Sequence, residues 1–375
     1  MAAASVTQIG RLMITDTKQA CESALPATGG PTPGAPEPVE GASYATVLEW
    51  ARTIGVSATV IYGDTDSVMP RLDNLPQTRA GMAIAWRILV ALAEYITRDV
   101  FAAWPEIVLE AEDMAWGYAI WETKKRYVKR LLDVKRWCCT ITSKGVESKR
   151  RDTPQLLRTI YNRVLSLMFP ANDEPPLTAD VITSVVIPYL RDAFGEIIRD
   201  AVDIGDYVVY KSLKSDYKSK AIAQLVVAEK RRKRILSGEE TGIPPKVGER
   251  IPYVITTGTG KVSMRAEDPA YIERRWAAGY KTPTIDRLYY VNNLLQTSLQ
   301  KLVSHVCAPQ ATQVIEHAKR VIACQLAATR ICNRRITEYG PMDQTSAVRR
   351  DAPSEPVITA LAPCKKKQRT MLSYV

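Results

Sequence analysis

The sequence predicts an α+β fold in which a small antiparallel sheet with covering helices is followed by a mainly helical half. β-branched and apolar residues flank a Gly-Asp-Thr-Asp turn between Val60 and Met69, which is typical of a β-hairpin. Apolar residues recur every three or four positions over 82–101, as on one face of a helix. From Asp152 onward helical stripes dominate, and a polar, proline-punctuated stretch follows Gly340.

The remaining elements follow from local patterns. Residues 5–20 and 44–52 are predicted to be helices, with a flexible insertion at 24–43 because Pro and Gly at that density sustain neither helix nor strand. Residues 107–112 alternate as a strand does, and the aromatic-rich residues 115–128 are predicted to form a second hairpin. No apolar run reaches the ~18 residues of a membrane span, so no membrane partner is expected.

Charge and cysteine usage narrow the classes of function. The chain has 51 Lys plus Arg against 40 Asp plus Glu, a net charge of +11, which favours a polyanionic partner. Its seven cysteines include no C-x-x-C pair, which argues against structural zinc. Neither of its two histidines has a matching Cys or Asp nearby, so neither is predicted to be a ligand or a base.

Two carboxylates, Asp64 and Asp66, would lie together at the turn of the first hairpin. Oxygen-only ligands held this way suit Mg²⁺. A calcium loop beginning at Asp64 would need Gly and Glu where the chain has Met69 and Leu75, so that alternative fails. Phosphohydrolases of the haloacid-dehalogenase type also place Asp-x-Asp after a strand, but they need alternating strand–helix units, which a helix-rich second half does not provide.

Basic residues gather at several places along the chain. Three adjacent cations beside an aromatic suit a phosphate backbone and a base or sugar edge. The run at 230–234 fits a nuclear-localisation or DNA-contact cluster and a solvated helix end equally well. The residues predicted to contact DNA are Lys124, Lys125, Arg126, Tyr127, Lys144, Lys149, Arg150 and Arg151.

Taken in order, these motifs resemble family B DNA-directed DNA polymerases over residues 4–305, interrupted by the insertion. Val60–Met69 is similar to the metal-binding palm hairpin of that family, and Lys124–Tyr127 to its primer-contacting motif. The resemblance implies a helix at the palm/fingers junction (1–23), a flexible insertion (24–43), a partial palm (44–150), a helical thumb (151–340) and a disordered tail (341–375).

The resemblance also implies two-metal nucleotidyl transfer to a primer 3′-hydroxyl, with primer–template DNA and dNTP as partners. Asp66 would be a direct Mg²⁺ ligand and Asp64 would lie at the site. The partner carboxylate of such enzymes lies in an Asp-…-Ser-Leu-Tyr-Pro run that this sequence lacks, as it lacks their Lys-…-Asn-Ser-x-Tyr-Gly helix. The chain is therefore expected to bind DNA but not to polymerise without an N-terminal half, and the alternative is a non-catalytic DNA- and clamp-binding module derived from a polymerase.

The C-terminal residues Gln368, Met371 and Tyr374 have the spacing of the peptide that binds the PCNA-like sliding clamp. One turn of 3₁₀ helix would project the Met and the Tyr together. Replicative relatives in eukaryotes carry C-terminal cysteine clusters, which this tail lacks. That difference favours a large double-stranded DNA virus as the source and the host nucleus as the location.

Overall fold

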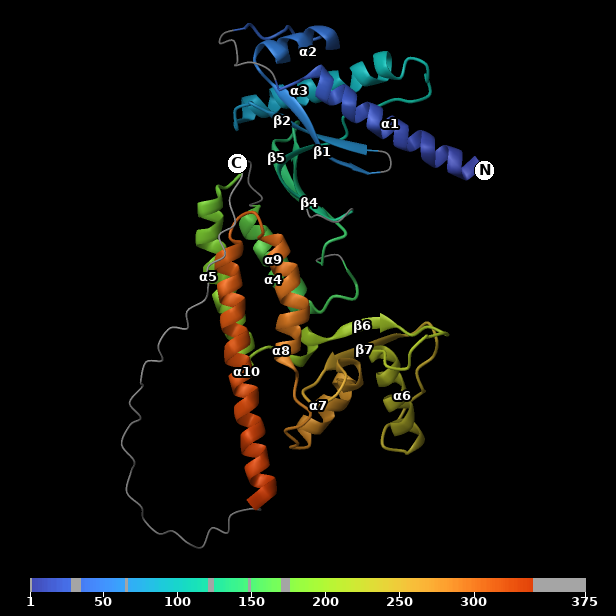
Figure 1. Ribbon diagram of the computed structural model, residues 1–375, viewed down its shortest axis with the longest axis vertical. Coiled ribbons are helices and arrows are strands. Elements are labelled where there is room, and N and C mark those ends of the chain that lie inside the picture. Colours follow the sequence, from blue (N-terminus) through green and yellow to red (C-terminus); the bar gives the residue numbers. More distant parts are fainter. Residues whose placement is uncertain are drawn as a thin grey trace, which may run out of the picture. The chain divides into compact units, whose positions relative to one another are not determined.

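The computed structural model describes residues 2–27, 35–64, 67–120, 125–147, 150–169 and 176–339. The chain divides into two compact units, Met1–Gln325 and Leu326–Val375. Within the first unit we call residues 2–147 the hairpin region and residues 150–325 the helical region (Figure 1). The domain boundaries predicted from the sequence, including the one at residue 151, stay predictions, and the tail at 341–375 lies outside the described residues.

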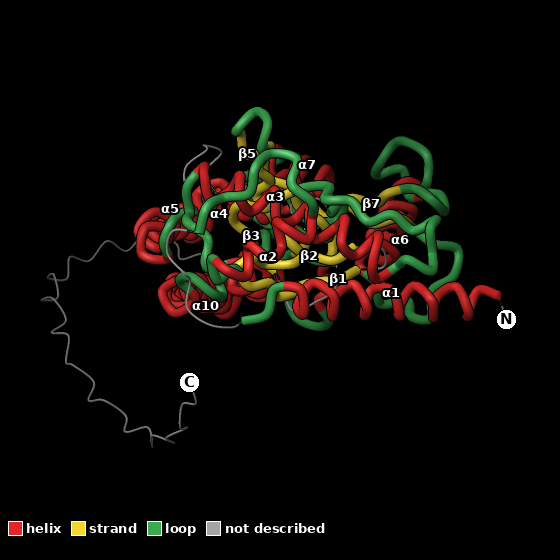
Figure 2. The backbone as a smooth tube through the Cα atoms, turned by 90° about the horizontal axis from the view of Figure 1, so that it is seen from above, coloured by secondary structure: helices red, strands yellow, loops and turns green. Residues whose placement is uncertain are grey.

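Helices surround the first hairpin. Ser43 and Thr78 cap two of them, because their hydroxyls accept hydrogen bonds from the backbone N–H groups of Thr46 (3.3 Å) and Gly81 (3.2 Å). The helix α1 packs against both strands of the hairpin, and Figure 2 shows it running alongside them. The structure confirms the predicted helices as α1 (Ala2–Ala24), α2 (Tyr44–Thr53) and α3 (Arg79–Tyr95), which continues into the π-helical turn η1 (Ile96–Val100).

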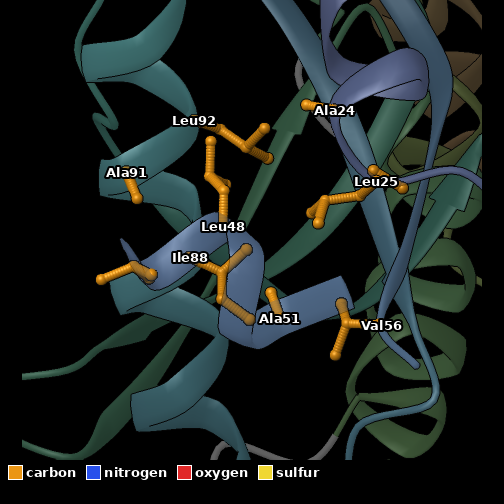
Figure 3. Packing of buried hydrophobic residues seen from close by; sticks show 10 residues of the cluster. Ala24, Leu25, Leu48, Ala51, Val56, Ile88, Ala91 and Leu92 are labelled. Carbon is orange, nitrogen blue, oxygen red and sulfur yellow. The ribbon is translucent and has the colours of Figure 1, made fainter. Parts of the chain in front are cut away.

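The core of this region joins α1, α2 and α3. Leu25, Leu48, Ile88 and Leu92 converge there and are almost wholly buried (Figure 3). Burying each such side chain contributes about 1.5–3 kcal/mol relative to exposure. The apolar face of α3 therefore forms part of the core against which the first hairpin packs.

Helix α3 with η1, Arg79–Val100, is long and apolar enough by length and composition to cross a membrane. The core helix of a soluble protein passes the same test. Here Ile88, Leu92 and Ile96 are buried against the rest of the hairpin region. Packing inside the protein thus accounts for the apolar residues of this helix.

A three-stranded antiparallel sheet follows in the order β3 (Met114–Ile120), β4 (Tyr127–Asp133) and β5 (Cys138–Lys144). Ile120 pairs with Tyr127, which confirms the hairpin predicted at 115–128. The strand predicted at 107–112 is wrong, since these residues belong to no sheet. The Thr97 hydroxyl accepts from the Leu109 backbone N–H at 2.8 Å, so a side chain takes the place of a neighbouring strand.

The described part of the predicted insertion contacts the helices. The indole N–H of Trp50 donates to the Ala35 carbonyl at 3.4 Å. Arg87 forms an ion pair with Glu37 at 3.0 Å. Residues 28–34 of the insertion lie outside the described residues.

The helical region contains a small sheet that the sequence patterns did not predict. Its order is β6 (Val209–Ser212), β7 (Arg250–Ile255) and β8 (Ala266–Glu267), all antiparallel. The helices of this region, of which the last continues past residue 325, confirm the predicted α+β class. They are α4 (Gln155–Met168), α5 (Ala179–Ile198), η3 (Ile204–Tyr207), α6 (Ala223–Leu236), η4 (Val262–Arg265), α7 (Pro269–Ala277), α8 (Arg287–Tyr290), η5 (Val291–Leu295), α9 (Gln296–Leu302) and α10 (Ala308–Tyr339).

Candidate nucleic-acid interface

The first hairpin is formed by β1 (Ser57–Asp64) and β2 (Ser67–Asp73). Asp64 pairs with Ser67, so the turn between the strands consists of residues 65 and 66. Asp66 lies outside the described residues, and the structure describes Asp64 only as the backbone end of β1. The pairing places the backbone of Asp64 at one end of the hairpin, and the roles of Asp64 and Asp66 as metal ligands stay predictions.

A β-bulge interrupts this hairpin before the turn. Val60 pairs with Pro70, but the next pair is Tyr62 with Met69, which leaves Ile61 without a residue opposite. Proline has no N–H to donate to a ladder, so a bulge beside Pro70 is physically reasonable. Bulges bend a strand and increase its twist, and this one sets the direction of the last residues before the turn.

The basic residues at the start of β4 lie against the hairpin. The Tyr62 hydroxyl accepts a hydrogen bond from the backbone N–H of Lys125 at 2.8 Å. The rings of Tyr62 and Tyr127 pack edge to face with centroids 5.5 Å apart. The predicted DNA-contact motif and the predicted metal hairpin are thus neighbours in space.

The second predicted basic cluster begins on the adjacent strand. Lys144 pairs with Tyr127 across β4 and β5. A Cβ placed on Gly145 would lie 2.1 Å from the carbonyl oxygen of Lys125, and Gly145 has a φ of +67°. Only glycine fits there, so Lys125 and Lys144, both exposed, are held at adjoining strand ends.

Two of the predicted DNA-contact arginines are ion-paired within the chain. Arg126 pairs with Glu147. Arg150 pairs with Asp152 at 3.2 Å and lies 3.8 Å from Glu147. The hydrogen bond from Arg150 outweighs partial burial and holds the pKa of the Asp152 carboxyl below its ordinary value. A phosphate would have to compete with these carboxylates for Arg126 and Arg150.

The other predicted contacts are less fully described. Arg151 is exposed, and its backbone carbonyl accepts from the Arg250 guanidinium at 3.0 Å. The same guanidinium donates to the Tyr210 carbonyl at 3.3 Å, which joins this loop to the β6–β7 sheet. Lys124 and Lys149, like the clamp-peptide residues Gln368, Met371 and Tyr374, lie outside the described residues.

The basic run on α6 is engaged within the fold. Arg234 is buried and bridges Glu240 (3.1 Å) and Glu267 (3.0 Å). Lys230 pairs with Glu267 at 3.1 Å, and Arg231 with Glu240 at 3.3 Å. Burial alone raises the pKa of the Glu240 carboxyl, but hydrogen bonds from arginines outweigh it and the pKa lies below its ordinary value. The run is neither a simple solvated helix end nor a freely accessible signal.

A large cavity lies elsewhere among the described residues. It has a volume of about 730 Å³, and its lining includes Ile61, Met69, Trp116, Phe169 and Leu302. None of the predicted DNA-contact residues lines it. Tyr62 does not line it either, so the cavity is not part of the contact between Tyr62 and Lys125.

The described residues do not by themselves form a metal site, since nowhere among them do three His, Cys, Asp or Glu side chains gather. The donor chemistry of the turn, two aspartates two residues apart, does suit Mg²⁺. A complete ligand set needs Asp66 and groups beyond the described residues.

An acidic turn beside exposed lysines is an arrangement suited to phosphate chemistry on a polyanion. The sequence model of DNA polymerase family B matches residues 1–306, and this chain belongs to that family. The family predicted from the sequence motifs is thereby confirmed. An origin in a virus stays a prediction.

Curated proteins match this chain at modest sequence identity. The chain is 30% identical over 276 residues to the DNA polymerase delta catalytic subunit of Schizosaccharomyces pombe, covering 70% of this chain and 22% of that protein. It is 26% identical over 320 residues to a DNA polymerase of Paramecium bursaria Chlorella virus NY2A, covering 84% of this chain and 29% of the relative. The chain thus spans roughly a quarter of the length of the relatives it matches.

A solved family B DNA polymerase from Pyrobaculum calidifontis is similar over 70% of this chain and 28% of its own. The identity is 20% and the TM-score 0.45, which is too low to support an argument about the site.

Sequence patterns alone missed two residues of this interface. The motifs of the sequence assign no separate role to Tyr62 or to Gly145. The signal for Tyr62 is its place as an aromatic two residues before a turn that carries function. Gly145, between Lys144 and Val146 at the end of a strand, carries the usual signal of a close backbone approach.

Proposed function

We propose that this chain supplies part of the palm (44–150) and the thumb (151–340) of a family B DNA polymerase and binds primer–template DNA. The observation that supports the proposal is the contact of Tyr62, which precedes Asp64 by two residues, with Lys125 at an exposed basic strand end. Membership in DNA polymerase family B supports the same assignment. The substrate of the complete enzyme would be dNTP and the reaction nucleotidyl transfer to a primer 3′-hydroxyl.

In this proposal Asp66 and Asp64 would hold Mg²⁺. When bound, the metal ions would activate the primer hydroxyl and neutralise charge on the triphosphate. The residues of this chain would have two tasks: the turn would present carboxylate oxygens, and Lys125 and Lys144 would hold the phosphate backbone beside them. Because the sequence lacks the partner Asp-…-Ser-Leu-Tyr-Pro run, we expect no primer extension by the 375 residues alone.

Metal binding can be tested without measuring activity. Fe²⁺ substituted for Mg²⁺ and activated with peroxide cuts the backbone close to where it binds. We expect cleavage within residues 62–68 in the presence of primer–template DNA. The Asp66→Asn variant should lose this cleavage, whereas Asp73→Asn, at the far end of the same hairpin, should keep it. Cleavage that is unchanged in Asp66→Asn would contradict the assignment.

Complementation separates an enzyme part from a non-catalytic DNA-binding module. The chain would be mixed with the segment of the S. pombe relative that precedes the matched part, and primer extension measured. If the chain contributes to catalysis, Asp66→Ala should abolish the restored extension. If extension is indifferent to that change, the non-catalytic alternative is correct.

We also propose that Gln368, Met371 and Tyr374 bind a PCNA-like sliding clamp. The support is their spacing, together with relatives named as delta catalytic subunits. A peptide of residues 365–375 titrated into PCNA in a calorimeter should bind, and the Met371→Ala/Tyr374→Ala peptide should not. Equal binding of the two peptides, or none by either, would reject this part.

We propose the nucleus as the location. Because α6 uses Lys230, Arg231 and Arg234 internally, we assign the nuclear-import signal to another basic run, Lys365-Lys366-Lys367. A fluorescent fusion should enter the nucleus, and replacing these three lysines by glutamine should keep it in the cytoplasm. A fusion that accumulates in the nucleus unaltered by that change would exclude the run as the signal.

A further inference from the structure

We propose that Tyr62 is a positioning residue that locks the basic strand end before β4 to the first hairpin, so that Lys125 keeps one fixed geometry for a phosphate. This inference rests on the proposed function, because it concerns how the same site is held. It assigns no contact between Tyr62 and the substrate.

The first support is that Tyr62 binds the basic motif in two independent ways. Its hydroxyl accepts from the Lys125 N–H at 2.8 Å, and its ring packs edge to face on Tyr127. The residues joined are 63 positions apart in the chain. Such a contact therefore couples two hairpins that covalent connection leaves independent.

The second support is the backbone of Lys125. Its φ is +62°, in the left-handed region that costs a non-glycine residue about 1 kcal/mol or more. Such a conformation persists only when the surroundings impose it. The hydroxyl of Tyr62 holds the N–H of Lys125, and the close approach of Gly145 confines its carbonyl. The residue is thus clamped on both sides.

The third support is where Tyr62 and Lys125 lie relative to the end of β1. Tyr62 precedes Asp64 by two residues on β1, a rise of about 7 Å along a strand. The adjacent Arg126 is anchored to Glu147. With its backbone fixed between these points, Lys125 presents an exposed side chain near the turn. Fixing such groups before the substrate arrives removes an ordering cost from binding and catalysis.

The test compares the full-length chain with Tyr62→Phe, which removes one oxygen and keeps the ring. Tyr210→Phe is the matched control, because Tyr210 lies half exposed on β6 and no described residue bonds its hydroxyl. Two readouts are measured: hydrogen exchange at the Lys125 amide, and binding of a fluorescein-labelled primer–template duplex over a series of salt concentrations. Thermal unfolding of each variant is followed in parallel.

We expect faster exchange at the Lys125 amide in Tyr62→Phe, and DNA binding weaker by about fivefold, the effect of one hydrogen bond. The slope of log affinity against log salt should fall by about one, as when one phosphate contact is lost. Lys125→Gln should reduce the salt slope by the same amount as Tyr62→Phe. The Tyr62→Phe/Lys125→Gln double variant should bind DNA no more weakly than either single variant. A merely structural role would change unfolding but leave the salt slope unaltered.

The inference is overturned if Tyr62→Phe matches Tyr210→Phe in amide exchange and salt slope, or if its effect adds to that of Lys125→Gln. If the unaltered chain does not bind the duplex, the proposed function fails, and amide exchange alone then decides whether Tyr62 holds Lys125. Should Tyr62→Phe lower the unfolding temperature strongly, both readouts are repeated well below that temperature, where the variant is folded. A salt slope and an amide exchange equal to those of Tyr210→Phe would still overturn the inference.

Discussion

In the hairpin region, Lys125 and Lys144 are exposed, while glycine geometry and a tyrosine hydroxyl fix their backbones. In the helical region, α6 carries a denser basic run, yet Lys230, Arg231 and Arg234 bond to Glu240 and Glu267. Arg234 also lies 4.0 Å above the ring of Tyr271. The basic side chains of one region lie exposed at a strand end, and those of the other hold the fold together.

The difference shows that the density of basic residues in a sequence does not measure their availability to DNA. What decides is whether the fold brings carboxylates to them. Glu240 follows Arg234 by six residues, but Glu267 is 33 residues away and joins only through the β7–β8 pairing. The following predictions test this division of roles.

The largest effect is expected for Arg234→Ala. The change leaves Glu240 and Glu267 buried without their shared partner, which should lower the free energy of unfolding by about 3–5 kcal/mol. Urea denaturation measures it. Arg232→Ala is the control, because Arg232 forms only an exposed pair with Glu229 at 3.5 Å and should cost about 0.5 kcal/mol or less. Equal losses in the two variants would refute a structural role for the buried network.

Gly145→Ala should have the next largest effect. The new Cβ would meet the Lys125 carbonyl, and the positive φ would be strained, together about 2–3 kcal/mol. Urea denaturation should show this loss, accompanied by weaker DNA binding. Gly205→Ala, where a Cβ has open space, should change neither. Gly145→Ala with wild-type stability would show that the Lys125 loop is free to move.

Acid should weaken the helical region through Glu240. The folded-state pKa of this carboxyl lies below its ordinary value of 4.5, so its contribution is present above pH 4.5 and is lost as the pH falls through the folded value. Urea denaturation at neutral pH and at pH values below 4.5 should show this loss. The Glu240→Gln variant should depend less on pH, whereas Glu239→Gln, at an exposed position, should behave as the unaltered chain does.

The smallest effect concerns DNA. Lys144→Gln should lower duplex affinity modestly, by the loss of one phosphate contact, and reduce the salt slope by about one. Lys233→Gln removes an exposed charge from the basic run of α6 and should leave the slope unchanged. Anisotropy titrations at several salt concentrations compare the two. A larger slope change for Lys233→Gln would reverse the roles we assign to the two regions.

How much of the fold could be predicted from the sequence depended on how far apart the interacting residues lie along the chain. The first hairpin was predictable because its turn and flanking residues are adjacent, and α3 because its apolar face repeats locally. The β6–β7 sheet was not, since its strands are separated by α6 and pair only after the chain returns. Residues 107–112 alternate like a strand, but their backbone bonds to the Thr97 side chain, which no local pattern indicates.

The site was predictable in kind but not in detail. The acidic turn and the basic motifs could be named from the sequence. Their closeness depends on Tyr62 and Gly145, which act through backbone atoms of Lys125. Side-chain type says little about such contacts. Likewise, the pairing of Arg126 with Glu147 and of Arg150 with Asp152 emerges only once the chain has folded.

The carboxylate-bridged arginine of α6 also constrains how this protein can evolve. Removing one of Arg234, Glu240 and Glu267 leaves the other two buried without that partner. Replacing all three by apolar side chains of similar volume is often neutral or stabilising. Single substitutions at Arg234, Glu240 or Glu267 should therefore be purged by selection. Divergent lineages are expected to have exchanged these positions in concert.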